Sequence, residues 1–252
     1  MSSVFEHLLN VKKKNGAGYL VLIDPDKQGI ESISALASRS SEAGVDAFLV
    51  GSSLLISDGL EASIRCLKDL SDLPVIISPG ASSHISRYAD ALLFLSLISG
   101  RNPDFLIGEH IKAAPIIKKY GLEAIPTGYM LIEGGSCTSV QFISATLPIP
   151  RDKLDIAIVH ALAAELMGMK VIYLECGSGS PLSVPDEMIS AVKAQINIPL
   201  IVGGGITDPD TAAAKVRAGA DFIVTGNVLE KADNISLMCE FARAIHDSQP
   251  KN

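Results

Sequence analysis

The sequence predicts one α/β domain, a single eight-stranded parallel barrel of the (β/α)8 or TIM type that occupies residues 1–252. Three observations support this prediction. Short, continuously apolar segments alternate with helical segments almost from end to end, which is typical of a parallel sheet covered on both faces. Eight such apolar segments can be counted. The chain has 252 residues, a length at which α/β barrels commonly remain one domain.

Each predicted strand is a short apolar run that leads into a turn. In chain order we expect strands at Tyr19–Asp24, Ala47–Val50, Val75–Ile77, Leu92–Leu95, Glu123–Pro126, Val171–Glu175, Leu200–Val202 and Phe222–Val224. Turns that carry glycine or aspartate follow several of these strands. Because the active sites of such barrels lie at the carboxyl ends of the strands, we expect the functional residues in these turns.

Most connections between the strands carry ordinary helix signals, such as the capping aspartate and first-turn proline of Asp208-Pro209. Two connections differ. Between the third and fourth strands only Ser82–Ala89 could be helical, barely two turns, so we expect the third crossover helix to be missing or vestigial. The segment Ile132–Arg151 is long and rich in Gly, Ser, Thr and Pro, which suggests a lid over the barrel mouth.

Composition and charge limit the classes of function. The formal net charge of -7 argues against a nucleic-acid partner, which would require clustered Lys and Arg. The four cysteines are scattered, without CxxC or metal-ligand spacing, as in a reduced intracellular protein. No apolar run has the length of a membrane helix, and no secretory signal is apparent. We therefore expect a cytoplasmic protein with at most peripheral membrane contact.

Three glycine-rich turns follow the last three predicted strands: Tyr173–Gly179, Gly203–Thr207 and Thr225-Gly226-Asn227. Glycine lets the backbone approach a ligand closely, and N–H groups at a helix start favour an anion. For one loop alone, a purely structural turn would explain the glycines equally well. Three such loops at adjacent barrel positions favour a phosphate site, and barrels of this type commonly bind phosphate there.

Together with five further motifs, these turns resemble the geranylgeranylglyceryl phosphate synthase family, a TIM-barrel group of prenyltransferases. The motifs that carry the resemblance are Ile23-Asp24-Pro25-Asp26-Lys27, Val50-Gly51-Ser52-Ser53, Arg101-Asn102-Pro103, Pro126-Thr127-Gly128-Tyr129, Ile149–Lys153, Tyr173–Gly179, Gly203–Ile206 and Gly226-Asn227. The family replaces the third barrel helix by an extended segment, which fits the short connection noted above. The chain departs from the family pattern at Cys176, often alanine, and at Ser52, usually glycine.

The resemblance implies a Mg²⁺-dependent transferase that joins a polyprenyl diphosphate, most simply geranylgeranyl diphosphate, to the 3-hydroxyl of sn-glycerol 1-phosphate and releases diphosphate. The ether product is a lipid precursor. The resemblance assigns the Mg²⁺ ion to Asp24 and Ser53, a hard cation with oxygen ligands. It assigns the glycerol phosphate to Tyr173, Leu174, Glu175, Cys176, Gly177, Ser178, Gly179, Gly204, Gly205, Gly226 and Asn227.

Within this scheme Glu175 orients the glycerol hydroxyl, takes its proton and stabilises developing positive charge on the prenyl chain. Tyr173 donates to the phosphate, whereas Tyr129 is either part of the site or simple packing. Phe105 resembles a family position at a subunit contact, although ordinary packing would explain one aromatic equally well. We expect a homo-oligomer. We expect an apolar trench for the prenyl chain, lined or flanked by Leu92, Leu93, Phe94, Leu95, Leu97, Ile98 and Phe105.

Other interpretations remain open. Each assigned residue could instead have a structural role: Asp24 in a turn or helix cap, Ser53 as a helix cap, and Glu175 as a contact at the barrel rim. A longer donor would make the protein a heptaprenylglyceryl phosphate synthase. A sugar-phosphate isomerase or lyase would need a Schiff-base lysine or a carboxylate pair, and no lysine lies inside a strand end. A non-catalytic sensor of phosphorylated metabolites would lack Asp24 or Glu175, yet both are present. The five histidines lie off the strand ends, so we expect no catalytic histidine.

Overall fold

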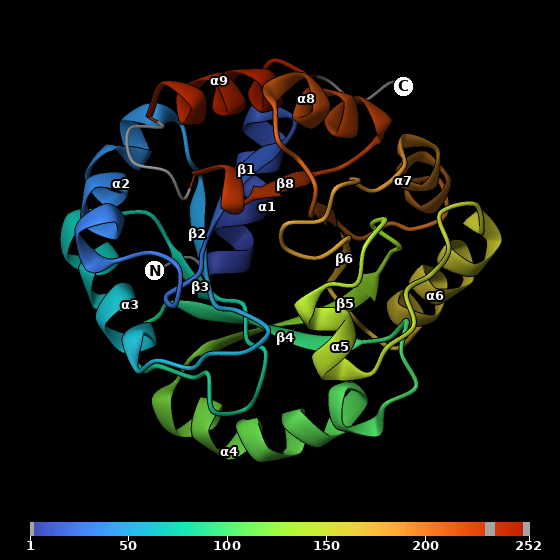
Figure 1. Cartoon of the computed structure of the whole chain (residues 1–252), viewed down its shortest axis with the longest axis horizontal. Coiled ribbons are helices and arrows are strands. Elements are labelled where there is room, and N and C mark those ends of the chain that lie inside the picture. Colours follow the sequence, from blue (N-terminus) through green and yellow to red (C-terminus); the bar gives the residue numbers. More distant parts are fainter. Residues whose placement is uncertain (1–2, 230–234, 249–252) are drawn as a thin grey trace.

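A computed structural model of the chain describes residues 3–229 and 235–248. In these residues eight strands form a closed parallel barrel in the order β1 to β8, surrounded by helices (Figure 1). The barrel closes through pairing of β1 with β8. The predicted fold class is therefore confirmed.

The strands occupy the predicted positions, and the fourth and fifth strands clearly extend beyond their predicted ends. Their bounds are Gly18–Ile23 (β1), Ala47–Val50 (β2), Val75–Ile77 (β3), Ala91–Leu97 (β4), Glu123–Leu131 (β5), Val171–Glu175 (β6), Leu200–Gly203 (β7) and Phe222–Thr225 (β8). The fifth strand is longer than the predicted Glu123–Pro126, and Pro126 lies within it. The strand continues to Leu131 because β4 pairs with it on one side and β6 on the other.

Helices cover the outside of the barrel between most successive strands. Their bounds are Val4–Asn15 (α1), Ile30–Ala43 (α2), Gly59–Leu70 (α3), Asp104–Gly108 (η1, a π-helical turn), Glu109–Tyr120 (α4), Ser139–Ser144 (α5), Leu154–Leu166 (α6), Asp186–Lys193 (α7), Pro209–Ala218 (α8), Asn227–Leu229 (η2, a 3-10 turn) and Ile235–His246 (α9). No helix stands between β3 and β4, where all residues are described. The prediction that the third crossover helix is missing is confirmed.

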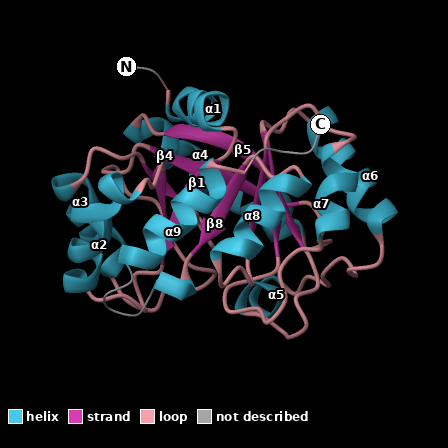
Figure 2. Cartoon of the chain, turned by 90° about the horizontal axis from the view of Figure 1, so that it is seen from above, coloured by secondary structure: helices cyan, strands magenta, loops and turns pink. Residues whose placement is uncertain are grey.

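Helix α1 closes the amino-terminal end of the barrel. A capping box between Ser3 and Glu6 starts this helix, and the Glu123 carboxylate at the start of β5 accepts from the Phe5 amide over 3.1 Å. Leu8 is 2% exposed and belongs to the cluster of residues inside the barrel. Figure 2 shows α1 at one end of the barrel and α5 at the other. The end at which α5 lies is therefore the one at which we expect a ligand site.

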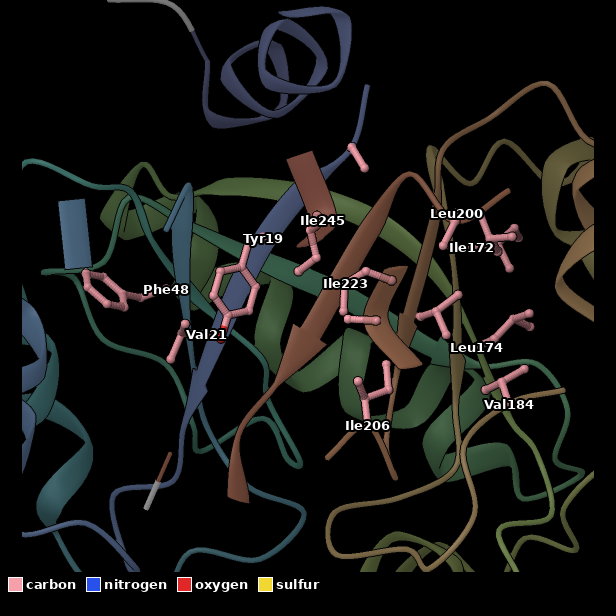
Figure 3. Packing of buried hydrophobic residues seen from close by; sticks show 14 of the residues in the cluster. Tyr19, Val21, Phe48, Ile172, Leu174, Val184, Leu200, Ile206, Ile223 and Ile245 are labelled. Carbon is pink, nitrogen blue, oxygen red and sulfur yellow. The ribbon is translucent and has the colours of Figure 1, made fainter. Parts of the chain in front are cut away.

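Two apolar layers hold the barrel together. Because alternate side chains of a strand point to opposite faces, Leu20 lies inside the barrel, whereas Tyr19 and Val21 point outward toward the helices. The outer layer is continuous from Tyr19 and Phe48 to Ile223 and Ile245 (Figure 3). This packing fixes the strand ends on which the functional loops are carried. Among the described residues, no helix is long and apolar enough to cross a membrane.

Candidate active site

A cavity of about 490 Å³ opens at the carboxyl ends of the barrel strands. Most of the predicted site residues line it, including the glycine loops after β6, β7 and β8 and, after β1 and β2, Asp24 and Ser53. The side chains of Leu174 and Cys176 do not line it. Alternate residues of β6 point outward, so these two side chains lie in the core layer under the helices. If they contribute to a ligand site, they do so through the backbone alone.

Glu175 ends β6 and is 7% exposed. Its Oε1 accepts from the Gly177 amide over 2.8 Å, and the Tyr173 hydroxyl also donates to this carboxylate. A Cβ atom at Gly203 or Gly204 would overlap the carboxylate oxygens. Glycine at these two positions is therefore what makes room for the glutamate. Burial raises the pKa of Glu175 to about 7, although the two hydrogen bonds act in the opposite direction.

Two tyrosines lie beside this carboxylate. Tyr129 and Tyr173 pack edge to face, with ring centroids 5.2 Å apart, and both line the cavity. Burial raises the pKa of each hydroxyl, and the neighbouring Glu175 charge raises it further. Both hydroxyls therefore stay protonated and can donate hydrogen bonds. The structure places Tyr129 in the cavity wall, which the sequence had left undecided.

The glycine loops meet on the same side of the cavity. Gly177 (φ 92°), Gly179 (φ 74°) and the pair Gly204-Gly205 (φ 79° and 67°) adopt left-handed conformations that other residues rarely take. The Ser178 hydroxyl donates to Asn227 Oδ1 over 2.6 Å, which joins the loop after β6 to the turn after β8. Loops distant in sequence thus form one surface of small residues. Such a surface is suited to a phosphate group.

Asp24 lines the cavity directly after β1 and is 8% exposed. Its Oδ2 accepts from Ser52 Oγ over 3.0 Å and lies 3.5 Å from Lys27 Nζ. Ser52, which departs from the family pattern, therefore contacts the predicted metal ligand directly. The Asp26 carboxylate accepts from the Ile56 amide over 2.7 Å and so fixes the loop after β2.

The donor set at Asp24 fits magnesium better than a tightly held transition metal. Among the described residues, no group of three or more His, Cys, Asp or Glu side chains could hold a metal ion. One buried carboxylate beside serine hydroxyls is instead typical of Mg²⁺, which takes one or two carboxylates and completes its shell with substrate oxygens and water. The chemistry of the residues present is therefore compatible with the predicted ion.

The rest of the cavity is an apolar arm. Its walls are formed by Ile85, Leu92, Phe94, Leu95, Leu97, Phe105, His110, Ala113, Val140 and Ile143. Two residues expected in or beside the trench do not line it, because Leu93 points into the barrel and Ile98 packs under the helices. The connection between β3 and β4, which has no helix, contributes Ile85 to this wall. His110 is a lining residue that the sequence does not reveal, because its role here is packing and not catalysis.

The lid segment, Ile132–Arg151, is attached to the glycine loop after β6. Gly134 accepts from the Leu182 amide over 3.1 Å and from the Ser180 hydroxyl over 2.8 Å. At its other end Asn102 donates to the carbonyl oxygen of Ser144 over 2.9 Å. Within the segment α5 supplies two apolar residues to the cavity wall, and Figures 1 and 2 both show this helix at the barrel mouth. The lid prediction agrees with this placement.

A model of a known protein family, described as the PcrB family, matches residues 9–244. The chain belongs to the PcrB family. A geranylgeranylglyceryl phosphate synthase of Chitinophaga pinensis is 47% identical over 249 residues, which covers 99% of this chain and 98% of that protein. The Thermococcus kodakarensis protein of the same name is 47% identical over 218 residues, 86% of each chain. The predicted resemblance is thus confirmed, and with it the prediction of an enzyme.

Solved structures agree with this assignment. The (S)-3-O-geranylgeranylglyceryl phosphate synthase of Thermoplasma acidophilum, in complex with sn-glycerol-1-phosphate, matches with a TM-score of 0.93 and 36% identity. The match covers 98% of this chain and 100% of that chain. The thiamine phosphate pyrophosphorylase of Pyrococcus furiosus, at a TM-score of 0.60 and 15% identity, shares the fold alone. This PcrB-family chain therefore has the barrel of a synthase known to bind a glycerol phosphate.

Proposed function

We propose that this PcrB-family protein is a Mg²⁺-dependent prenyltransferase that joins geranylgeranyl diphosphate to the 3-hydroxyl of sn-glycerol 1-phosphate. One observation carries the proposal. A buried glutamate, Glu175, lines the same cavity as a surface of glycine loops, the apolar arm and Asp24. An anionic acceptor, a base, a metal ligand and an apolar donor site are thereby adjacent. The names of the relatives support the same reaction.

The acceptor phosphate binds the glycine loops after β6, β7 and β8, and the Tyr173 hydroxyl, which in this structure donates to Glu175, turns to the phosphate as a further donor. The glycerol 3-hydroxyl then lies at Glu175, which accepts its proton as the oxygen attacks C1 of the prenyl chain. A base with a pKa of about 7 suits this step, because it is largely deprotonated just above neutral pH yet still basic. The glutamate also stabilises positive charge that develops on the allylic carbon. Burial strengthens this interaction, since water is excluded.

Asp24 and Ser53 would hold the Mg²⁺ ion, with Ser52 and Lys27 next to the aspartate. The ion supplies neutralisation of the diphosphate, which is otherwise a poor leaving group. The apolar arm takes the prenyl chain and keeps water from the reacting carbon. A sugar-phosphate substrate would have no use for this arm, so the isomerase or lyase alternative finds no support in the cavity. A heptaprenyl donor remains the alternative within prenyl transfer.

The reaction is tested with labelled sn-glycerol 1-phosphate, Mg²⁺ and a panel of farnesyl, geranylgeranyl and heptaprenyl diphosphates. We expect an extractable ether lipid, formed fastest with the geranylgeranyl donor. sn-Glycerol 3-phosphate serves as the matched acceptor control and should react poorly. Formation of no ether product from any donor would rule out prenyl transfer, and fastest turnover of the heptaprenyl donor would select the alternative.

The metal role is tested by chelation and by Asp24→Asn. Removing Mg²⁺ with EDTA should abolish turnover, and adding Mg²⁺ back should restore it. Asp24→Asn keeps the shape of the side chain but removes its charge, so turnover should fall at least about 100-fold. Calorimetry should find acceptor binding unchanged in this variant, because Asp24 is not among the residues assigned to the glycerol phosphate. Full activity of Asp24→Asn, or of the EDTA-treated enzyme, would remove the metal from the proposal.

We further propose that the enzyme forms a homo-oligomer and acts in the cytoplasm. Helix α6 supports the first point, because apolar residues dominate its sequence and Val159 and Leu166 are 58% and 88% exposed. A helix with apolar residues on every side is usually covered on every side. A second copy of this chain is the partner that we expect on this helix.

A further inference from the structure

Helix α4 begins with a departure from regular helix geometry. Residues Asp104–Gly108 form a π-helical turn that runs directly into the helix, and the Glu109 amide closes it on the carbonyl oxygen of Asp104. Such turns are rare and occur frequently at functional sites. This turn supplies Phe105 to the apolar arm, and Glu109, His110 and Ala113 continue the same wall. The π turn therefore decides which side chains of this element face the cavity.

A serine of the barrel holds this turn in place. Ser96 lies in β4, is 3% exposed, and its Oγ donates to the carbonyl oxygen of Leu106 in the middle of the turn, over 2.9 Å. Two residues earlier, Phe94 packs edge to face against the ring of His110, with centroids 4.3 Å apart. Phe94 and Ser96 share one face of the strand. The sheet thus contacts the start of α4 at two successive points.

The opposite side of the arm is fixed as well. Glu109 accepts from the Ser82 amide, in the extended segment that replaces the third helix, and pairs with Lys112 over 2.6 Å. The hydrogen bond from Lys112 and those from Ser82 lower the pKa of Glu109 to about 2, so it stays ionised near neutral pH. Glu109 is the first residue after the π turn. A change in the turn would therefore move this anchor together with the apolar wall.

We propose that Ser96 is a positioning residue for the prenyl donor: by holding the carbonyl group of Leu106 it keeps residues 104–108 in the π form and so sets the outer wall of the apolar arm. The inference rests on the proposed prenyl transfer. A π turn holds one residue more than an α-helical turn. If it reverts to a regular α-helix, the register shifts by one residue and the side chains that follow rotate by about 100° around the helix axis. Phe105 and His110 would then no longer face the arm together.

The matched pair Ser96→Val and Ser96→Thr tests this role, because the two variants have nearly the same shape and differ in the hydroxyl. We expect Ser96→Val to raise the KM for geranylgeranyl diphosphate by roughly three- to tenfold, as for one lost hydrogen bond. Its preference among farnesyl, geranylgeranyl and heptaprenyl donors should also flatten. The KM for sn-glycerol 1-phosphate should not change. Ser96→Thr should restore wild-type values in all three measurements.

Ser40→Ala is the control, because it removes a buried serine hydrogen bond away from the cavity wall. Ser40 is fully buried in α2 and donates to the carbonyl oxygen of Leu36 over 2.6 Å. This variant should lower the melting temperature without changing either KM. If Ser96→Val is too unstable to assay, Ser96→Ala is compared with wild type by amide exchange. The amide of Glu109, which closes the π turn, should then exchange faster, while the amides of α6 should not.

Three results would overturn the inference: a wild-type donor KM and preference in Ser96→Val, equal impairment of the threonine and valine variants, or an equal rise of both KM values. Unchanged exchange at Glu109 in Ser96→Ala would do the same. Failure of the proposed function is distinguishable from these results. In that case the wild-type protein itself would transfer none of the three donors.

Discussion

Glu175 has the side chain whose chemistry depends most on its surroundings. Its carboxylate is buried against two glycines and a tyrosine, and the resulting pKa of about 7 lies well above the ordinary value of 4.5. As a base it must be deprotonated. We therefore expect kcat/KM to rise with pH up to about 7 and then level off. Glu175→Gln should lose at least about 100-fold in kcat and should not show this rise. Wild-type kcat in the variant would place the base elsewhere.

The same pKa has a consequence for stability. Because burial raises the pKa, the folded state binds the proton more tightly than the unfolded state. The stabilisation is complete below about pH 4.5 and is lost as the pH rises through 7. Between these values the free energy of unfolding of the wild type should fall, relative to Glu175→Gln, by on the order of 3 kcal/mol. Urea unfolding of both proteins across this range measures the difference. Parallel curves would contradict the raised pKa.

Substitution of Gly204 tests whether glycine is needed at this position to make room for the Glu175 side chain. Gly204 and Gly121 both have positive φ, at 79° and 68°, but only a Cβ at Gly204 would meet other atoms. Gly121→Ala should cost roughly 1 kcal/mol from backbone strain alone and leave activity unchanged. Gly204→Ala should in addition displace the Glu175 carboxylate and abolish acceptor binding. Calorimetry with sn-glycerol 1-phosphate measures this, and equal behaviour of the two variants would refute the argument.

At the scale of whole elements, the two ends of the barrel have different tasks. Helix α1 closes the amino-terminal end and contributes no residue to the cavity, whereas the lid segment and η1 shape the opposite end. Barrels of this type commonly separate stability from activity in this way. The location of an element along the barrel axis therefore predicts which property a mutation will change.

Leu8 and Leu9 of α1 provide a matched test of this separation. Leu8 is 2% exposed and fills the barrel end, while its neighbour Leu9 is 37% exposed. Leu8→Ala should lower the free energy of unfolding by about 2–5 kcal/mol, and Leu9→Ala by well under about 1 kcal/mol. Both variants should keep wild-type kcat at a temperature where they are folded. A loss of kcat in folded Leu8→Ala would show that the closed end also influences the chemistry.

At the scale of the whole molecule, the exposed apolar face of α6 is the feature that one barrel leaves uncovered. Leu166→Glu places a charge on this face, where a second copy would bury it. We expect the wild type to form an oligomer in analytical ultracentrifugation and the variant to dissociate. Leu70→Glu, on α3 and 44% exposed, is the control and should leave the assembly intact. A monomeric wild type, or an intact Leu166→Glu oligomer, would contradict the proposed interface.

Features that depend on local pattern could be predicted from the amino-acid sequence. Apolar runs placed the eight strands, a connection too short for a full helix revealed the missing crossover, and the glycine strings located the turns around Gly177 and Gly204. The family motifs named Asp24 and Ser53 as well. These residues could be found because strand periodicity and glycine geometry are encoded by near neighbours in the chain.

Features that depend on contacts across the barrel became visible in the folded chain alone. The raised pKa of Glu175 comes from burial, the bond of Ser52 to Asp24 joins two strand ends, and the π turn is bound from β4 through Ser96. None of these has a signature in nearby sequence. Solvent exclusion and hydrogen bonding act between groups that folding brings together, so the chemistry of the site is a property of the closed barrel.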